Sequence, residues 1–443
     1  ALPVDGLLSP FVTTSLLDRA VDLHVPGAGG FAYSVGELGG NGAIAVYQRD
    51  RVDGDLSLLA VYSEGDPTDE QGGSSINGLD SPRAIISSSD GAYLYVAASG
   101  SDSVLVFSRD PQSGLITFVA RYSDGEAAID GLGGVADLSI GPRGNYLYAA
   151  GELDDAIAVF AVDSGSGELQ FVDRLGQGDP RDNGPVDGLN GVVALAWSQG
   201  YLFAVARDNQ SLAAFEADPS TGLLEPVAVV QNFQMMAPSL DGPSDVIAAG
   251  EELVVAAGGG NAISRFTFDP ERTPAFERKA LVQNGDDDIV DLVGPSSLAY
   301  APRQQRLYVA SPVSGSVHLF SLRSDQPRLL EQYPADSVSE LSGLIAVAIP
   351  VENGPLYGLT ANAGLSVFAR QRGSLCPLNG KGSLGEHAVE IMPGGSLDYT
   401  VSGTIFANAT GSLVYQVAAN SRFAERERSP GDNVDPHRTD LVP

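Results

Sequence analysis

The sequence lacks two features that commonly stabilise or anchor a protein. Cys376 is the only cysteine among 443 residues, so no disulfide can form within the chain and packing alone must hold its fold. No apolar run reaches 18 residues, and we therefore expect neither a membrane-spanning helix nor direct insertion into a membrane.

Basic residues are also few. Lysine and arginine together number 25, against 56 aspartate and glutamate residues, which gives a formal net charge of −31. A field of this sign repels phosphate backbones and anionic membrane surfaces, so we expect no nucleic-acid partner. The same field favours solubility and attracts divalent cations. The charge therefore indicates either a plain solvated surface or calcium binding.

Glycine (53 residues) and proline (27 residues) are abundant, and they separate short runs rich in Val, Leu, Tyr and Phe. Within these runs apolar residues alternate with period two, which is typical of strands and excludes long helices. One such run, ending in an aromatic residue, recurs seven times at intervals of 48 to 60 residues. The aromatic residues are Tyr47, Phe107, Phe160, Phe215, Phe266, Phe320 and Phe368. This period predicts an all-β, seven-bladed β-propeller over residues 1–373, with four strands in each blade.

The N-terminal segment gives a prediction about how the ring closes. The seventh copy supplies inner strands through 365–370, but no outer strand follows it. Residues 9–17 precede the first inner strand and can fill that place. Pairing of these two distant segments would remove the open sheet edge of an incomplete ring.

Two of the copies carry a family resemblance. Residues 81–125, which read SPRAIISSSDGAYLYVAASGSDSVLVFSRDPQSGLITFVARYSDG, and the equivalent 135–179 resemble the lactonase-type seven-bladed propellers of bacteria. The similarity extends over residues 15–371. The resemblance implies the propeller fold and, as a possible activity, hydrolysis of a lactone or sugar acid.

From Ser374 the period breaks, and residues 374–443 form a second predicted domain. The stretch 391–420, IMPGGSLDYTVSGTIFANATGSLVYQVAAN, is similar to the repeated immunoglobulin-like domains of large bacterial surface proteins. The resemblance implies a small immunoglobulin-like β-domain, or a fragment of one, in a longer parent chain. The alternative is a C-terminal extension packed on the propeller.

Three aspartates occupy one aligned position of the innermost strands. Asp22, Asp137 and Asp245 fall on blades one, three and five, so they could face a central channel as a cage of oxygen atoms. Such a cage suits a hard cation such as calcium, and three unpaired carboxylates would repel one another without it. The alternative is that they bond to backbone amides of neighbouring strands.

A second acidic cluster lies in the loop between the fifth and sixth copies. Asp286, Asp287, Asp288 and Asp291 lie within six residues of one another, and we consider them a weaker candidate metal site. The cluster does not have the spacing of an EF-hand loop. A recurring Asp-Gly motif in these loops favours plain turn chemistry instead.

The sequence gives no catalytic motif, since it contains neither Gly-x-Ser-x-Gly nor His-Glu-x-x-His. We therefore expect no catalytic residue and, as the main reading, a non-enzymatic, adhesin-like protein of the bacterial cell surface or extracellular matrix. Its propeller would be a rigid binding or assembly module for other surface proteins, glycans or copies of itself. The alternative is a metal-dependent lactone or sugar-acid hydrolase that holds its metal with Asp22, Asp137 and Asp245.

Overall fold

The computed structural model describes residues 9–13, 17–26, 30–50, 55–67, 75–235, 239–334, 343–349, 356–361, 364–369, 411–418 and 434–441. The chain divides into two compact units, Ala1–Leu397 and Asp398–Pro443. Within the described residues no helix is long and apolar enough to cross a membrane.

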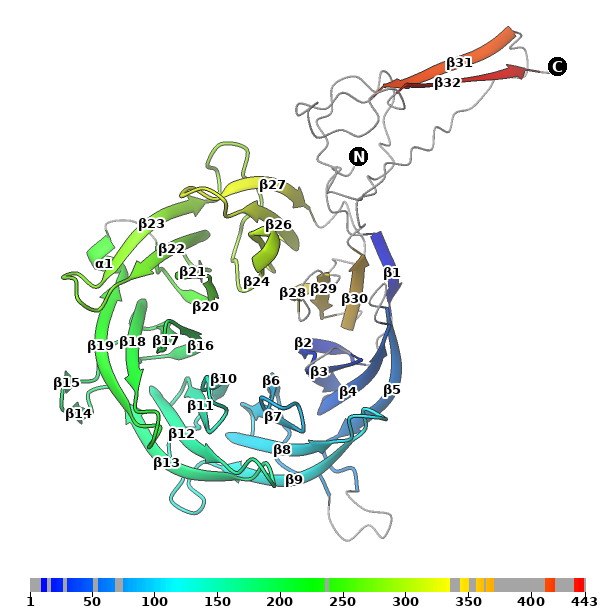
Figure 1. Cartoon of the computed structure of the whole chain (residues 1–443). Coiled ribbons are helices and arrows are strands. Elements are labelled where there is room, and N and C mark those ends of the chain that lie inside the picture. The colour runs from blue at the N-terminus through cyan, green and yellow to red at the C-terminus, as the bar shows by residue number, and fades with distance from the viewer. Residues whose placement is uncertain are drawn as a thin grey trace. The chain divides into compact units, whose positions relative to one another are not determined.

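The first unit is an all-β propeller, as the repeat predicted. Six antiparallel, four-stranded sheets follow one another along the chain and stand in a ring around a central axis (Figure 1). Blade 1 comprises β2 (Arg19–His24), β3 (Phe31–Leu38), β4 (Asn41–Arg49) and β5 (Leu56–Ser63); blade 2 comprises β6 (Pro82–Ser87), β7 (Tyr93–Ala98), β8 (Ser103–Arg109) and β9 (Ile116–Ser123); and blade 3 comprises β10 (Val135–Ile140), β11 (Tyr146–Gly151), β12 (Ala156–Val162) and β13 (Leu169–Gly176). Blade 4 comprises β16 (Val192–Ser198), β17 (Tyr201–Ala206), β18 (Ser211–Ala217) and β19 (Leu224–Gln231); blade 5 comprises β20 (Pro243–Ala249), β21 (Glu252–Ala257), β22 (Ala262–Phe268) and β23 (Phe276–Gln283); and blade 6 comprises β24 (Ser297–Ala301), β25 (Arg306–Ser311), β26 (Ser316–Ser321) and β27 (Arg328–Tyr333).

A seventh sheet combines both ends of the propeller. Its order is β1-β30-β29-β28, with β28 (Leu344–Ala348), β29 (Leu356–Thr360), β30 (Gly364–Ala369) and the N-terminal β1 (Ser9–Thr13). β1 runs antiparallel to β30, with Ser9 opposite Ala369 and Pro10 opposite Phe368. The N-terminal strand therefore lies where the sequence placed residues 9–17, at the outer edge of the last blade.

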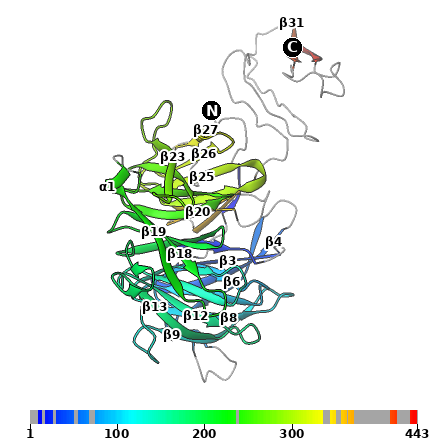
Figure 2. The same cartoon turned by 60° about the vertical axis from the view of Figure 1, so that its left-hand side comes forward.

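Short elements lie in the loops between blades: β14 (Pro180–Arg181), β15 (Gly184–Pro185) and the helix α1 (Asn232–Met235). The 3₁₀ turn Pro302–Gln304 joins β24 to β25 within blade 6. Figure 2 shows the blades from the side, with the outer strands β9, β13 and β19 at their rims.

Apolar layers between neighbouring blades form the core. Tyr33 and Val46 of blade 1, for example, share one buried cluster with Ile85 and Val96 of blade 2. Alternate residues of a strand point to opposite faces, so each blade contributes to the layer on either side. The repeated aromatic residues lie in these layers, and Phe107 is fully buried. Phe368 lies in β30, whose side chains are outside the described residues.

Tyrosine hydroxyls reinforce the contacts between blades. Tyr33 donates to the carbonyl oxygen of Gly114 on the next blade at 2.7 Å, and Tyr148 donates to that of Gly222 at 3.1 Å. In both cases the second strand of one blade reaches the turn between the third and fourth strands of the next. A buried hydroxyl thus gains a partner and fixes one blade against the other.

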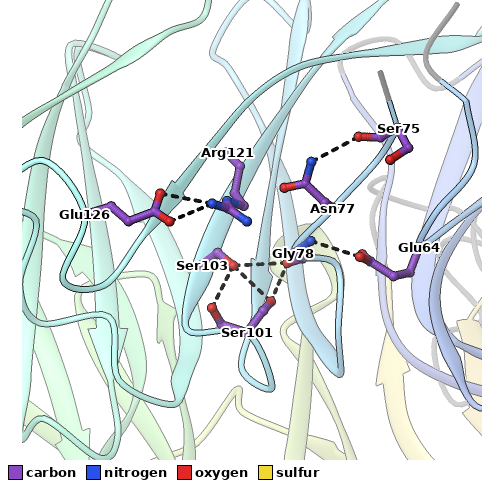
Figure 3. Close-up of polar contacts among 8 residues, drawn as sticks. All are labelled: Glu64, Ser75, Asn77, Gly78, Ser101, Ser103, Arg121 and Glu126. Atoms are coloured by element: carbon purple, nitrogen blue, oxygen red, sulfur yellow. Dashed lines mark hydrogen bonds and ion pairs between the residues drawn. The ribbon is translucent and has the colours of Figure 1, made fainter. Parts of the chain in front are cut away.

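The loops between blades share one construction. The first residue of a loop accepts the amide proton of a later, fully buried leucine with its side-chain oxygen: Glu64 with Leu79, Asp124 with Leu132, Gln177 with Leu189, Asn232 with Leu240 and Asn284 with Leu292. Figure 3 shows the first of these loops, in which the Glu64 carboxylate also accepts from Gly78 at 3.2 Å and Ser103 donates to the Gly78 carbonyl at 3.1 Å. Each loop therefore caps the apolar layer beneath it.

The second unit is described only in part. β31 (Gly411–Ala418) and β32 (Val434–Leu441) pair as an antiparallel hairpin, with Gly411 opposite Leu441. Most of the predicted immunoglobulin-like domain, 374–443, lies outside the described residues, and so do Cys376 and His387. The immunoglobulin-like prediction stays a prediction.

Removing the N-terminal strand should destabilise the propeller. Deletion of residues 1–13 leaves β30 without its outer neighbour and exposes a sheet edge. We expect the melting temperature, measured by circular dichroism, to fall by several degrees and the deleted protein to aggregate more readily. Deletion of 398–443 is the matched control, and equal melting temperatures for both truncations would contradict the role of β1.

Candidate functional site

The aspartates of the innermost strands tie neighbouring blades together. Asp22 accepts the amide proton of Leu23 at 2.7 Å with Oδ1 and that of Ile85, on blade 2, at 2.8 Å with Oδ2. β6 has a strand neighbour on one side only, so amides on its other edge need a different acceptor. The same contact to the following blade joins Asp137 to Leu195 and Asp245 to Leu298.

The alternation along the ring follows from this contact. The strand position of Asp22 is held by Ala84 on blade 2 and by Ala194 on blade 4. In each case the amide that donates to the carboxylate belongs to the residue after the alanine. The small alanine side chain leaves room for the carboxylate. Ser297 occupies the position on blade 6, and its Oγ accepts the amide proton of Val347, on blade 7, at 3.2 Å.

Burial changes the acidity of these carboxyl groups. Each residue is half-buried, and its carboxyl group lies among protein atoms. This burial raises the pKa of Asp22 to about 6 and those of Asp137 and Asp245 to about 7. The amide hydrogen bonds lower these pKa values in part. The other aspartates of the ring raise the pKa of Asp137 further.

The oxygen atoms of these aspartates do not gather into a cage. In the described part of the chain, the one group of three or more His, Cys, Asp or Glu side chains with ligand atoms within 4.8 Å of one another is Asp124, Asp130 and Asp154. Arg174 already lies in that group, 3.5 Å from Asp130. The amide-bonded alternative therefore describes how the structure uses Asp22, Asp137 and Asp245.

The second predicted cluster is a solvated loop. Asp286, Asp287, Asp288 and Asp291 are all exposed. Asp286 accepts the amide proton of Gln283 at 2.9 Å, which is turn chemistry of the kind the sequence indicated. Among the described residues these four form no group with ligand atoms within 4.8 Å.

The raised pKa values predict that the protein is more stable in mild acid. The folded state holds protons on Asp22, Asp137 and Asp245 up to about pH 6 to 7, whereas the unfolded chain releases them near pH 4. The free energy of unfolding should therefore fall as pH rises from about 4 to about 7. We expect a lower melting temperature at about pH 8 than at about pH 5.

Substitution separates this effect from repulsion across the whole acidic surface. Asp→Asn changes at positions 22, 137 and 245 together should flatten the dependence of melting temperature on pH, because Asn does not titrate. The matched control replaces the exposed Asp182, Asp208 and Asp288 by Asn, with the same change of charge. Equal slopes in the two triple variants would refute the assignment.

A different group of charged residues lies at one end of the propeller, on three neighbouring blades. This face, called the loop face below, carries the loops between blades and the turns between second and third strands. Arg83 lies at the start of β6, Glu152 directly after β11 and Arg207 directly after β17, on blades 2, 3 and 4. Arg83 Nη1 lies 3.0 Å from Glu152 Oε2, and Arg207 Nη1 contacts Oε1. These three residues form the Arg83–Glu152–Arg207 triad.

The triad occupies one side of a ring of equivalent positions. At the register position of Glu152 the blades carry, from blade 1 to blade 7, Glu37, Ser99, Glu152, Arg207, Gly258, Pro312 and Ala361. Glu37 lies within β3, whereas the other six directly follow the second strand of their blade. Charged residues thus stand on blades 1, 3 and 4, whereas blades 5 to 7 present small or apolar residues. A ligand at the axis would meet hydrogen-bonding groups on one side and short side chains on the other.

The triad has the groups needed for acyl transfer to water. The Glu152 side chain is 19% exposed and those of Arg83 and Arg207 are 41% and 43% exposed, so solvent reaches all three. A carboxylate can accept a proton from water, and a guanidinium carries five N–H donors that can stabilise an oxyanion. The proton acceptor and the oxyanion-stabilising donors therefore lie together, because both guanidiniums contact the Glu152 carboxylate.

The sequence did not identify the triad because its members look like ordinary turn residues. Arg83, Glu152 and Arg207 are separated by 69 and 55 residues. Arg83 is the second residue of β6, and Glu152 and Arg207 directly follow β11 and β17. The repeat did carry a signal, since the position after the second strand could have been compared between blades. Only the ring brings the three together.

Two histidines lie inside the propeller and are engaged structurally. His24 Nε2 lies 2.9 Å from Ser87 Oγ on the next blade. Burial, aided by the Arg109 charge, lowers the pKa of His24 to about 4, so it is neutral at physiological pH. His318 Nε2 lies 2.7 Å from the carbonyl oxygen of Val290, and burial lowers its pKa.

Comparison with known protein families assigns the chain to one of them. The model of the family described as "Lactonase, 7-bladed beta-propeller" matches residues 19–128 and 120–240, which together span half of the chain. The chain belongs to this lactonase family. The seven sheets of the structure agree with the blade number in the family description.

Individual relatives of this lactonase-family chain are distant. A 6-phosphogluconolactonase of Bacillus subtilis is 31% identical over 146 residues, which cover 32% of this chain and 39% of the relative. A periplasmic gluconolactonase of Pseudomonas aeruginosa has 17% identity and a TM-score of 0.55, covering 75% of this chain and 97% of its own. The hydrazine synthase of Kuenenia stuttgartiensis has 16% identity and the same TM-score, covering 82% and 98%. At these identities the solved structures show the fold alone.

The comparisons overturn the main functional reading of the sequence. Family and relatives carry lactonase names, which point to an enzyme instead of an adhesin-like, extracellular, calcium-binding assembly module. The error arose from requiring a short linear motif for catalysis. Charged residues that lie at strand ends of three different blades form no such motif.

Proposed function

We propose that the protein hydrolyses the lactone ring of a sugar acid at the Arg83–Glu152–Arg207 triad. The observation that supports it is a carboxylate held between two guanidiniums on adjacent blades, in a chain of the lactonase family. The lactone names of the relatives in Bacillus subtilis and Pseudomonas aeruginosa supply the substrate class.

In this mechanism Glu152 acts as the general base. It takes a proton from a water molecule whose oxygen bonds to the lactone carbonyl carbon. The carbonyl oxygen becomes an oxyanion, which N–H groups of Arg83 and Arg207 stabilise. The bond to the ring oxygen then breaks, and that oxygen receives the proton back from Glu152. The product is the open-chain hydroxy acid.

Replacement of the base tests the proposal. Glu152→Gln keeps the size and one acceptor oxygen but cannot take up the proton, so we expect kcat/KM for glucono-1,5-lactone to fall by about 100-fold or more. Rates are measured by acid release in a pH-stat, with spontaneous hydrolysis subtracted. Glu37→Gln, at the equivalent position of blade 1, is the matched control and should retain activity. Full activity in Glu152→Gln would reject the mechanism.

A chelator separates this mechanism from the metal-dependent alternative. The proposed groups are one carboxylate and two guanidiniums, and the guanidiniums supply the positive charge that a metal would otherwise supply. We expect lactone hydrolysis to persist after dialysis against excess EDTA. Loss of activity with EDTA, restored by a divalent cation, would contradict this assignment.

A further inference from the structure

The immediate surroundings of the triad are acidic. Asp80 precedes Arg83 by three residues, Asp154 follows Glu152 by two, and Asp208 adjoins Arg207. Three residues of chain span at most about 11 Å, and the Debye length in physiological salt is about 8 Å, so salt screens these charges from the triad only in part. These charges therefore act on a ligand together with the triad. The local set has two guanidiniums and four carboxylates. The group that Asp154 forms with Asp124 and Asp130 adds two carboxylates and the Arg174 guanidinium, so the acidic excess remains.

Two other arginines of the loop face are engaged by acids of their own. Arg121 contacts Glu126 at 2.7 Å, and Arg174 contacts Asp130 at 3.5 Å. Because these cations are already paired, they add little positive field at the triad. The net charge of −31 has the same sign as the local imbalance.

We propose that the preferred substrate is an uncharged, unphosphorylated sugar lactone, and that a 6-phosphorylated lactone is disfavoured by the acidic surroundings of the triad. This inference rests on the proposed function. It chooses between two substrate types that share the reacting ring and differ in charge at the far end of the sugar.

The physical reason is the charge of the phosphate ester. Near pH 7 it carries about −1.5 to −2 charges, whereas glucono-1,5-lactone carries none. In the proposed complex the lactone carbonyl is directed at the triad and the phosphate lies elsewhere on the loop face, where Asp80, Asp154 and Asp208 accompany the arginines. Two guanidiniums that already share Glu152 cannot neutralise both the phosphate and these carboxylates.

The test compares the two lactones on the full-length protein. We expect kcat/KM for glucono-1,5-lactone to exceed that for 6-phosphoglucono-1,5-lactone by about tenfold or more at low salt. The gap should narrow as sodium chloride is added, because screening weakens the repulsion of the phosphate alone. The value for the uncharged lactone should not depend on salt.

Charge substitution next to the triad gives an independent readout. Asp80 and Asp208 are exposed, and the double variant Asp80→Asn, Asp208→Asn should raise kcat/KM for the phosphorylated lactone by about four- to tenfold. It should leave the uncharged lactone within about twofold. Glu168→Gln, on a turn between third and fourth strands and hence on the opposite face, is the control and should change neither value.

The outcomes are distinguishable. Faster hydrolysis of the phosphorylated lactone, or an equal rate with no response to the double variant, overturns the inference and leaves the proposed function standing. If neither lactone is hydrolysed above the spontaneous rate, the proposed function fails and the inference fails with it.

Discussion

The propeller depends on the contact between one blade and the next. A blade alone is a four-stranded sheet with apolar residues on both faces and a free edge at the axis. Neighbouring blades bury those faces, and a carboxylate such as Asp22 supplies an acceptor for an amide of the next innermost strand. With no disulfide within the chain, these repeated contacts and the pairing of β1 with β30 must hold the ring.

The same contacts explain the distribution of acids around the axis. If every blade carried an aspartate at the position of Asp22, like charges would crowd the axis and raise one another's pKa values. Alternation with Ala84 and Ala194 avoids this crowding and leaves room for each carboxylate. The aspartates that looked like metal ligands in the sequence thus bond to backbone amides in the structure, and the cost of burying them is seen in their raised pKa values.

The charged residues of the loop face use the ring in a different way. Arg83, Glu152 and Arg207 belong to three blades and are not part of the apolar layers between them. The scaffold fixes their separation because each adjoins a strand end. In such a protein we expect function to depend on residues of the turns and strand ends, and stability to depend on the layers between blades.

The sequence by itself determined the fold class, since a period of about 50 residues with alternating apolar positions admits few architectures other than a propeller. It also placed the strand that joins the last blade, because the seventh copy lacks an outer strand. It did not assemble the site. Asp22, Asp137 and Asp245 share a repeat position and a residue type and were noticed for that reason. Glu152 and Arg207 share a repeat position but have opposite charges, and Arg83 lies at a different position of its blade. Only the closed ring, which brings turns from separate blades to one axis, decided that these three side chains meet.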